Sequence, residues 1–244
     1  MSEDTALSLR QVSKRFGGLV AVDDVSFDVR QHEILGLIGP NGSGKTTLLN
    51  MISGRLRLTS GRIDLFGVRL SGRAAFRIAR RGVARTFQQV RILPAMTVKE
   101  NVAAGGVFAH RRYWGAELES RVSYLLRQVN LVGKEGMPVG ALTYIDQKRV
   151  ELARALMSDP KLLLLDEWLA GLNPSEMKVG IELINGLRFE GRCIIVVEHA
   201  MDAIRSLCDR CVVINSGAKI AEGTPGDVLN DAEVIRAYLG DEHA

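Results

Sequence analysis

The sequence predicts an α/β fold with an antiparallel β subdomain and an inserted helical subdomain, and three observations support this prediction. Short apolar runs of strand length alternate with helical segments, which is typical of a mostly parallel sheet buried on both faces. Two early segments alternate apolar and polar residues, as antiparallel strands with one buried face do. Between about residues 91 and 158 the chain becomes helical and rich in Arg, Ala and Leu.

The first part of the chain is expected to carry most of the strands. Its elements are, in order, strands over 7–13, 22–30 and 33–38, a helix over 47–52 that stops at Gly54, a strand over 61–67, a helix over 73–81 and a strand over 83–87.

The helical segment and the last part follow. A capping-box pattern at Thr97 and Glu100 opens one helix, and helices over 117–129 and 143–157 come next. The remaining elements are a strand over 161–166, a helix over 174–188, a strand over 192–197, a helix over 200–207, strands over 210–214 and 218–221, and two short C-terminal helices. The chain is therefore expected to form one domain over 1–244, with 91–158 as the helical subdomain and 1–90 and 159–244 as the α/β core with the β subdomain.

Composition narrows the function classes. The chain has 244 residues, 46% of them hydrophobic and 25% charged, with a formal net charge of +4, which are ordinary globular values. No window approaches the roughly 18 apolar residues of a membrane span, and the acidic N-terminus does not resemble a signal peptide, so a cytosolic location is expected. The basic clusters are short and lack interleaved aromatic residues; solvated faces rather than nucleic-acid contacts are expected for Arg77, Arg80, Arg81, Arg85, Arg111 and Arg112.

Three cysteines, Cys193, Cys208 and Cys211, occur in the chain. The spacing of Cys208 and Cys211 suits a metal, but no second pair exists to complete four ligands. Buried structural thiols are the expected alternative.

An eight-residue glycine-rich segment follows the apolar run 33–38 and precedes a helix: Gly39, Pro40, Asn41, Gly42, Ser43, Gly44, Lys45 and Thr46. Strand, glycine-rich turn and helix in this order form the context of a P-loop, whose backbone N–H groups cradle phosphates. Lys45 is expected to reach the β- and γ-phosphates, Thr46 to ligate Mg²⁺, and Thr47 to contact the nucleotide as well. An unliganded turn is the alternative, but all eight positions and both flanks fit. The segment predicts binding of a nucleoside triphosphate.

Other polar residues complete this chemistry. Asp166 and Glu167 end an apolar strand, where the first could hold Mg²⁺ and the second could activate a water as general base. His199 ends a second such strand and could contact the γ-phosphate, although a lone histidine there is more often structural. Gln88 could coordinate Mg²⁺ and water at the start of the helical segment. Phe16, followed by two glycines, could offer a platform to a purine ring or could equally be a core residue.

Together these residues resemble, in order and spacing, an ABC-type ATPase domain, and the resemblance covers essentially the whole chain. It implies ATP and Mg²⁺ as ligands, Phe16 as the adenine-stacking aromatic residue, and residues 171–173 as the D-loop. The ending over 234–240 resembles the ATP-binding subunits of branched-chain amino acid importers.

Two departures from the family pattern stand out. The signature segment, normally Leu-Ser-Gly-Gly-Gln, reads Leu-Thr-Tyr-Ile-Asp over 142–146. Thr143 and Asp146 are expected to form a capping box, and Ile145 is expected to place a β-branched side chain close to the phosphate. Trp168 stands where proline usually follows the glutamate. These departures put optimal catalysis in doubt, but not nucleotide binding.

The resemblance also implies partners. Two such domains dimerise head to tail, and the odd signature suggests a related but different ATPase subunit as partner, with a homodimer as the alternative. Integral membrane permeases, and indirectly a periplasmic substrate-binding protein, would complete an importer, with this chain on the inner face of the plasma membrane and no nucleic acid bound. The alternatives are a soluble ABC ATPase of DNA repair or translation, a nucleotide-clamping subunit with weak hydrolysis, and, more distantly, a P-loop kinase.

Overall fold

The computed structural model describes residues 4–107, 109 and 112–239; Arg111 of the second basic cluster, the first three residues of the acidic N-terminus and Gly240 of the C-terminal motif lie outside them. The strands are β1 (Thr5–Phe16), β2 (Leu19–Arg30), β3 (Ile34–Ile38), β4 (Ser60–Leu65), β5 (Val68–Arg69), β6 (Val83–Arg85), β7 (Leu162–Asp166), β8 (Cys193–Val197), β9 (Arg210–Asn215) and β10 (Ala218–Gly223). The helices are α1 (Lys45–Ile52), α2 (Ala75–Ala79), α3 (Val98–Ala104), α4 (Gly115–Gln128), α5 (Tyr144–Leu156), α6 (Pro174–Phe189), α7 (Met201–Leu207), α8 (Pro225–Leu229) and α9 (Ala232–Leu239), with a 3₁₀ turn over Val139–Ala141.

Two sheets organise these elements. The six-stranded sheet has the order β10-β9-β3-β8-β7-β6, and all its neighbours are parallel except β10 with β9. The four-stranded sheet has the order β2-β1-β4-β5 with antiparallel pairing. The α/β fold with an antiparallel sheet is therefore confirmed. The predicted strand over 83–87 is two residues too long, because it leaves the sheet after Arg85.

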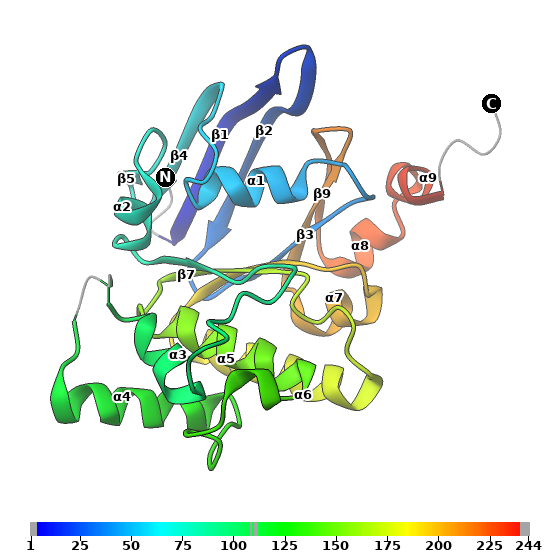
Figure 1. Ribbon diagram of the computed structural model, residues 1–244. Helices are drawn as coiled ribbons and strands as arrows, with labels where there is room; N and C mark the ends of the chain where they lie inside the picture. Colours follow the sequence, from blue (N-terminus) through cyan, green and yellow to red (C-terminus); the bar gives the residue numbers. More distant parts are fainter. Residues whose placement is uncertain (1–3, 108, 110–111, 240–244) are drawn as a thin grey trace.

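Each face of the six-stranded sheet is covered by a different layer (Figure 1). Ile34 and Ile38 of β3 pack with the helical side of the molecule, whereas Leu35 and Leu37 pack with α1 and the antiparallel sheet. This alternation follows from the two-residue period of a strand, and burial on both faces explains the continuous apolar run that the sequence shows there. Helix α1 is thus enclosed between the two sheets.

Helices α3, α4 and α5 lie between β6 and β7 in the chain and pack on one another. The capping box predicted at Thr97 is present, with the Glu100 N–H donating to the threonine hydroxyl oxygen and the Glu100 carboxylate accepting from the Thr97 N–H. None of the helices in the described ranges is long and apolar enough to cross a bilayer.

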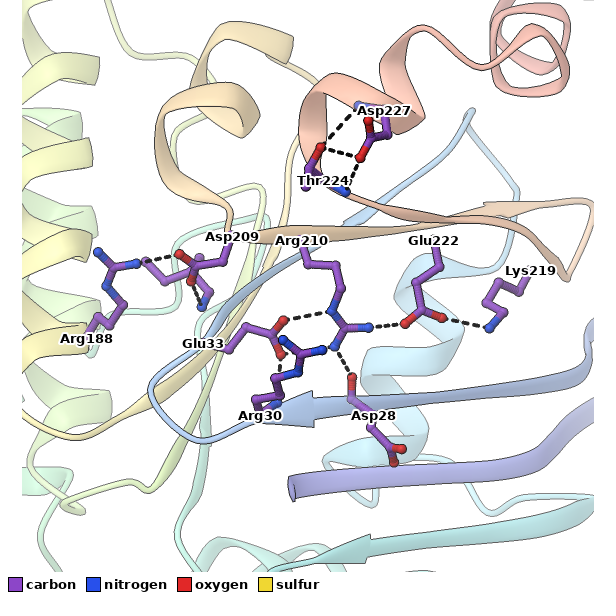
Figure 2. Close-up of polar contacts among 11 residues, drawn as sticks. Asp28, Arg30, Glu33, Arg188, Asp209, Arg210, Lys219, Glu222, Thr224 and Asp227 are labelled. Atoms are coloured by element: carbon purple, nitrogen blue, oxygen red, sulfur yellow. Dashed lines mark hydrogen bonds and ion pairs between the residues drawn. The ribbon is translucent and has the colours of Figure 1, made fainter. Parts of the chain in front are cut away.

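An arginine of β9 links the two sheets away from the glycine-rich turn (Figure 2). Arg210 donates to the Glu33 carboxylate at 2.8 Å and to the Asp28 carbonyl oxygen at 2.5 Å, and it also pairs with Glu222 of β10. Because Asp28 belongs to β2 and Glu33 precedes β3, one side chain fixes the antiparallel sheet against the parallel one.

The cysteines are buried free thiols, as the sequence analysis expected. Cys208 and Cys211 lie next to each other against Gly36 of β3, where a Cβ would come within 3.0 Å of either sulfur. A hydrogen bond with Cys211, together with burial, raises the pKa of the Cys208 thiol. Among the described residues, no group of three or more His, Cys, Asp or Glu side chains is placed to hold a metal ion.

Candidate functional site

The glycine-rich turn between β3 and α1 is built for close approach of backbone. Gly39, Gly42 and Gly44 have φ values of 148°, 78° and 110°, which favour glycine. A Cβ on Gly39 would lie 1.9 Å from the Ile214 carbonyl oxygen, and one on Gly44 would lie 2.6 Å from the Ala21 carbonyl oxygen. The turn therefore forms a cradle of backbone that only glycine permits, and this fits a bound phosphate.

Lys45, the first residue of α1, curls back over this cradle. Its Nζ donates to the carbonyl oxygens of Gly39 and Pro40, both at 2.8 Å, and the residue is only 6% exposed. Burial lowers the pKa of Lys45, while Glu167 and Asp166 oppose this effect. A buried ammonium held only by its own loop can exchange these carbonyls for phosphate oxygens, which form stronger, charge-assisted hydrogen bonds.

Asp166, at the end of β7, is paired with a residue that the sequence analysis assigned to a solvated basic face. The Arg85 guanidinium donates to Asp166 Oδ2 at 2.7 Å and to Asn50 Oδ1 at 2.7 Å, and the Arg85 and Asp166 side chains are 6% and 4% exposed. That assignment is wrong for Arg85, because β6 runs next to β7 in the sheet. Asp166 Oδ1 is buried and has no hydrogen-bond partner in the described ranges. An acceptor left in this way beside the cradle fits a magnesium ion or its water shell.

Two of the predicted site residues, Gln88 and His199, contact a third, Glu167. The Gln88 side-chain amide donates to Glu167 Oε2 at 2.8 Å, and His199 Nε2 lies 3.2 Å from Glu167 Oε1. Gln88 follows β6, Glu167 follows β7 and His199 follows β8, so the parallel order of the strands brings their carboxyl ends to one edge. In this structure Gln88 contacts the glutamate, whereas its predicted role as a metal ligand stays a prediction.

Phe16 ends β1 in the hairpin with β2, where it pairs with Leu19. Its ring is not in the core, since the residue is 45% exposed. The hairpin lies beside the cradle, because Ala21 approaches Gly44 and the Asp23 N–H donates to the Gly217 carbonyl oxygen at 2.8 Å. An exposed aromatic ring at this place could stack on a purine.

Comparison with known proteins agrees with a nucleotide-binding site of this kind. The model of the ABC transporter family covers residues 22–170, which include the cradle, Gln88 and Glu167. The chain belongs to the ABC transporter family. A second family model, described as branched-chain amino acid ATP-binding cassette transporter, covers residues 218–244.

Individual relatives extend over nearly the whole chain. The chain is 41% identical over 250 residues to the high-affinity branched-chain amino acid transport ATP-binding protein LivG of Salmonella typhimurium, covering 96% of this chain and 98% of the relative. It is 39% identical over 249 residues to the corresponding protein BraF of Pseudomonas aeruginosa, with the same coverage. A nucleotide-free ATP-binding cassette of an ABC transporter superimposes with a TM-score of 0.88 at 30% identity, covering 97% of this chain and 99% of that one. The ADP conformation of MJ1267, an ATP-binding cassette of an ABC transporter, gives the same values.

These matches identify the chain as an ATPase of the ABC transporter family, with the P-loop ABC fold that the sequence predicted. They favour the transport function over the soluble alternative in repair or translation. Binding of ATP or ADP is a property of the family, as the ADP-bound neighbour shows.

The signature segment of this ABC ATPase differs from its expected geometry at two residues. Thr143 accepts from the Asp146 N–H at 3.4 Å, but the reciprocal half of the capping box is missing, because the Asp146 carboxylate pairs with Lys134 and Arg149 instead. Ile145 is 7% exposed and belongs to the helical core, so its side chain packs inside the molecule instead of standing at the surface as expected. Two members of the segment are exposed: Thr143, and Tyr144 at 48%.

Trp168, the second departure, is buried at 1% exposure. Its indole packs against Gly180 of α6, where an added Cβ would lie 3.1 Å from the ring and 2.6 Å from the Leu169 side chain. Glycine on the facing helix turn makes room for the large side chain.

Sequence reasoning missed three charged residues around the site: Arg85, Lys148 and Glu198. All three are nearly buried, with Lys148 and Glu198 at 2% exposure each. Their positions at strand ends could have indicated two of them, since Arg85 is the last residue of one strand of the parallel sheet and Glu198 directly follows another. Burial raises the pKa of Glu198 to about 7, with the Leu169 amide and Lys148 opposing the rise.

Proposed function

We propose that this chain is the ATP-hydrolysing subunit of an importer for branched-chain or related amino acids, with Mg²⁺ held by Thr46 and Asp166. The substrate class is supported by the names of the LivG and BraF relatives and by the C-terminal family match over residues 218–244. The metal is supported by the unpartnered Oδ1 of Asp166.

The observation that carries the hydrolytic role is the convergence of Gln88 and His199 on Glu167. Each donor contacts a different carboxylate oxygen, at 2.8 Å and 3.2 Å, so the carboxylate is oriented from two sides. Glu167 also lies close enough to Lys45 for its charge to oppose the lowering of the Lys45 pKa by burial, so the carboxylate is near the phosphate cradle. A carboxylate held in this way can accept a proton from a water that attacks the γ-phosphate, while Lys45 and the backbone amides of the cradle hold the phosphates.

Partners follow from the same proposal. A second ATPase subunit, head to tail, would bring its signature segment to the Lys45 site, and membrane permeases would convert closure and opening of the pair into transport. A periplasmic substrate-binding protein would deliver the amino acid to those permeases, which would place this chain at the inner face of the plasma membrane. The division of the chain into an α/β core over 1–90 and 159–244 and a helical subdomain over 91–158 belongs to this proposal, and the packing of α3, α4 and α5 on one another supports it.

Glu167→Gln tests the hydrolytic role. The amide keeps the size and one acceptor but cannot take the proton, so turnover should fall by about a hundred-fold or more while ATP still binds. The variant should also accumulate as an ATP-bound dimer, which size-exclusion chromatography with ATP and Mg²⁺ detects. Hydrolysis by this variant at near the wild-type rate would remove Glu167 from the mechanism.

A further inference from the structure

A buried lysine holds the backbone that directly follows the proposed general base. Lys148 lies in the second turn of α5 and is 2% exposed. Its Nζ donates to the carbonyl oxygens of Glu167 at 3.2 Å, Trp168 at 2.8 Å and Ala170 at 2.8 Å. An ammonium has three N–H donors and no acceptor, so these three carbonyls use its whole hydrogen-bonding capacity.

The same segment is held from a second side. The Leu169 N–H donates to Glu198 Oε1 at 2.6 Å, and the Trp168 indole N–H donates back to the Lys148 carbonyl oxygen at 3.3 Å. Lys148 and Glu198 attract each other across residues 167–170, since each shifts the pKa of the other toward its charged form. Helix α5 and the loop after β8 therefore clamp four consecutive residues.

The clamp acts on a strained backbone. Glu167 has a φ of 51°, a left-handed conformation that is strained in a non-glycine residue and persists only when its surroundings enforce it. Its N–H donates to the Val197 carbonyl oxygen at 2.8 Å, and its own carbonyl oxygen is held by Lys148. The direction in which the Glu167 side chain leaves the backbone thus depends on these contacts.

We propose that Lys148 is a positioning residue for hydrolysis: by fixing residues 167–170 it holds the Glu167 carboxylate between Gln88 and His199. This inference rests on the proposed role of Glu167. Lys148 itself contacts no nucleotide site and acts only through the backbone.

The test compares three variants of the full chain in steady-state ATP hydrolysis. Lys148→Met keeps the unbranched stem and removes the ammonium, so kcat should fall by about ten- to a hundred-fold while the KM for ATP changes by less than about two-fold. Lys148→Arg restores the cation and should recover most of the loss. Arg149→Met is the matched control, since it removes a neighbouring cation of the same helix whose ion-pair partner within the described ranges is Asp146. Its kcat should stay within about two-fold of the wild type.

Fluorescence gives a second readout. The chain has two tryptophans, and Trp114 is 70% exposed, so Trp114→Phe leaves Trp168 as a buried reporter within the clamp. In that background Lys148→Met should shift the emission of Trp168 to longer wavelength, and Arg149→Met should not. If Lys148→Met does not fold, Lys148→Gln replaces it in the test, since glutamine keeps a shorter N–H donor. This variant should show a smaller fall in kcat, again with little change in KM.

The outcomes separate this inference from the proposed function. If Glu167→Gln abolishes turnover but Lys148→Met or Lys148→Gln leaves kcat unchanged, the positioning role is wrong and the general base stands. An equal loss of kcat in Arg149→Met, or a loss that Lys148→Arg does not recover, would likewise overturn it. If Glu167→Gln itself hydrolyses ATP normally, the proposed function fails first.

Discussion

Replacing Glu198 by glutamine should change how the stability of this chain depends on pH. The carboxyl group is 2% exposed, and burial raises its pKa from 4.5 to about 7, although the Leu169 N–H and Lys148 favour the charged form. The folded state therefore keeps a proton that the unfolded chain releases near pH 4.5. The stabilisation is fully present below that pH, is lost as pH rises toward 7, and changes little above it.

The size of this effect follows from the two pKa values. At 1.36 kcal/mol per pH unit, the full loss amounts to about 3 kcal/mol, most of which falls between pH 5 and pH 8. Glutamine keeps an acceptor for the Leu169 N–H and carries no charge, so Glu198→Gln should lack this loss. We expect the variant to gain about 2–3 kcal/mol relative to the wild type over that interval.

Urea unfolding of both proteins, followed by circular dichroism at several pH values between 5 and 8, measures the difference directly. All other titrating groups are common to the two proteins and cancel in the comparison. Parallel curves over the interval would refute the reasoning, because they would mean that the Glu198 carboxylate is stabilised by Lys148 and the backbone as well as it is by water.

Two further predictions concern packing around the site and use the same urea measurements. Arg85→Met should lower the free energy of unfolding by about 3–5 kcal/mol, because it leaves the buried Asp166 carboxylate without its partner, and a loss below about 1 kcal/mol would contradict the buried pair. Gly180→Ala should destabilise by about 1–3 kcal/mol, because its Cβ would lie 2.6 Å from the Leu169 side chain. Gly186→Ala on the same helix, where no atom lies within 4 Å, should instead stabilise by about 0.5–1 kcal/mol, and equal effects of the two would rule out the contact.

The phosphate cradle could be predicted from sequence because its information is local. Glycines at three positions between a strand and a helix specify both the turn and its ligand, and the structure gives them the positive φ values that the pattern requires. The parallel strands could be predicted for the same reason, since runs such as Leu162–Leu165 are apolar on both faces. The short strand β5 was not predicted, because two residues are too few to show the alternation of apolar and polar side chains that marks a strand.

The charged partners could not be found in this way, because they depend on strand order. Arg85 and Asp166 are 81 residues apart, and only the placement of β6 beside β7 joins them. The sequence shows that a charged residue interrupts an apolar segment. It does not show which oppositely charged residue pairs with it in the fold. Lys148 is a further example. Its three acceptors are backbone carbonyl oxygens, which every residue type carries, so no sequence pattern indicates them.

The orientation of the signature segment changes what its unusual residues imply. The expectation of an unequal dimer depended on Ile145 crowding the partner's phosphate, but that side chain belongs to the helical core and is 7% exposed. What the helix presents outward is the Tyr144 ring, which lies close to Gly171 of the D-loop segment. The first-turn amides of α5 and the Thr143 hydroxyl remain near the surface, and these are the groups that an anion recognises at a helix N-terminus. Two glycines of the family pattern are thus replaced in different ways, because Ile145 anchors the helix in the core whereas Tyr144 stands exposed. Crowding of a partner's phosphate would therefore come from the Tyr144 ring and not from Ile145, and the unequal dimer stays a prediction that depends on Tyr144.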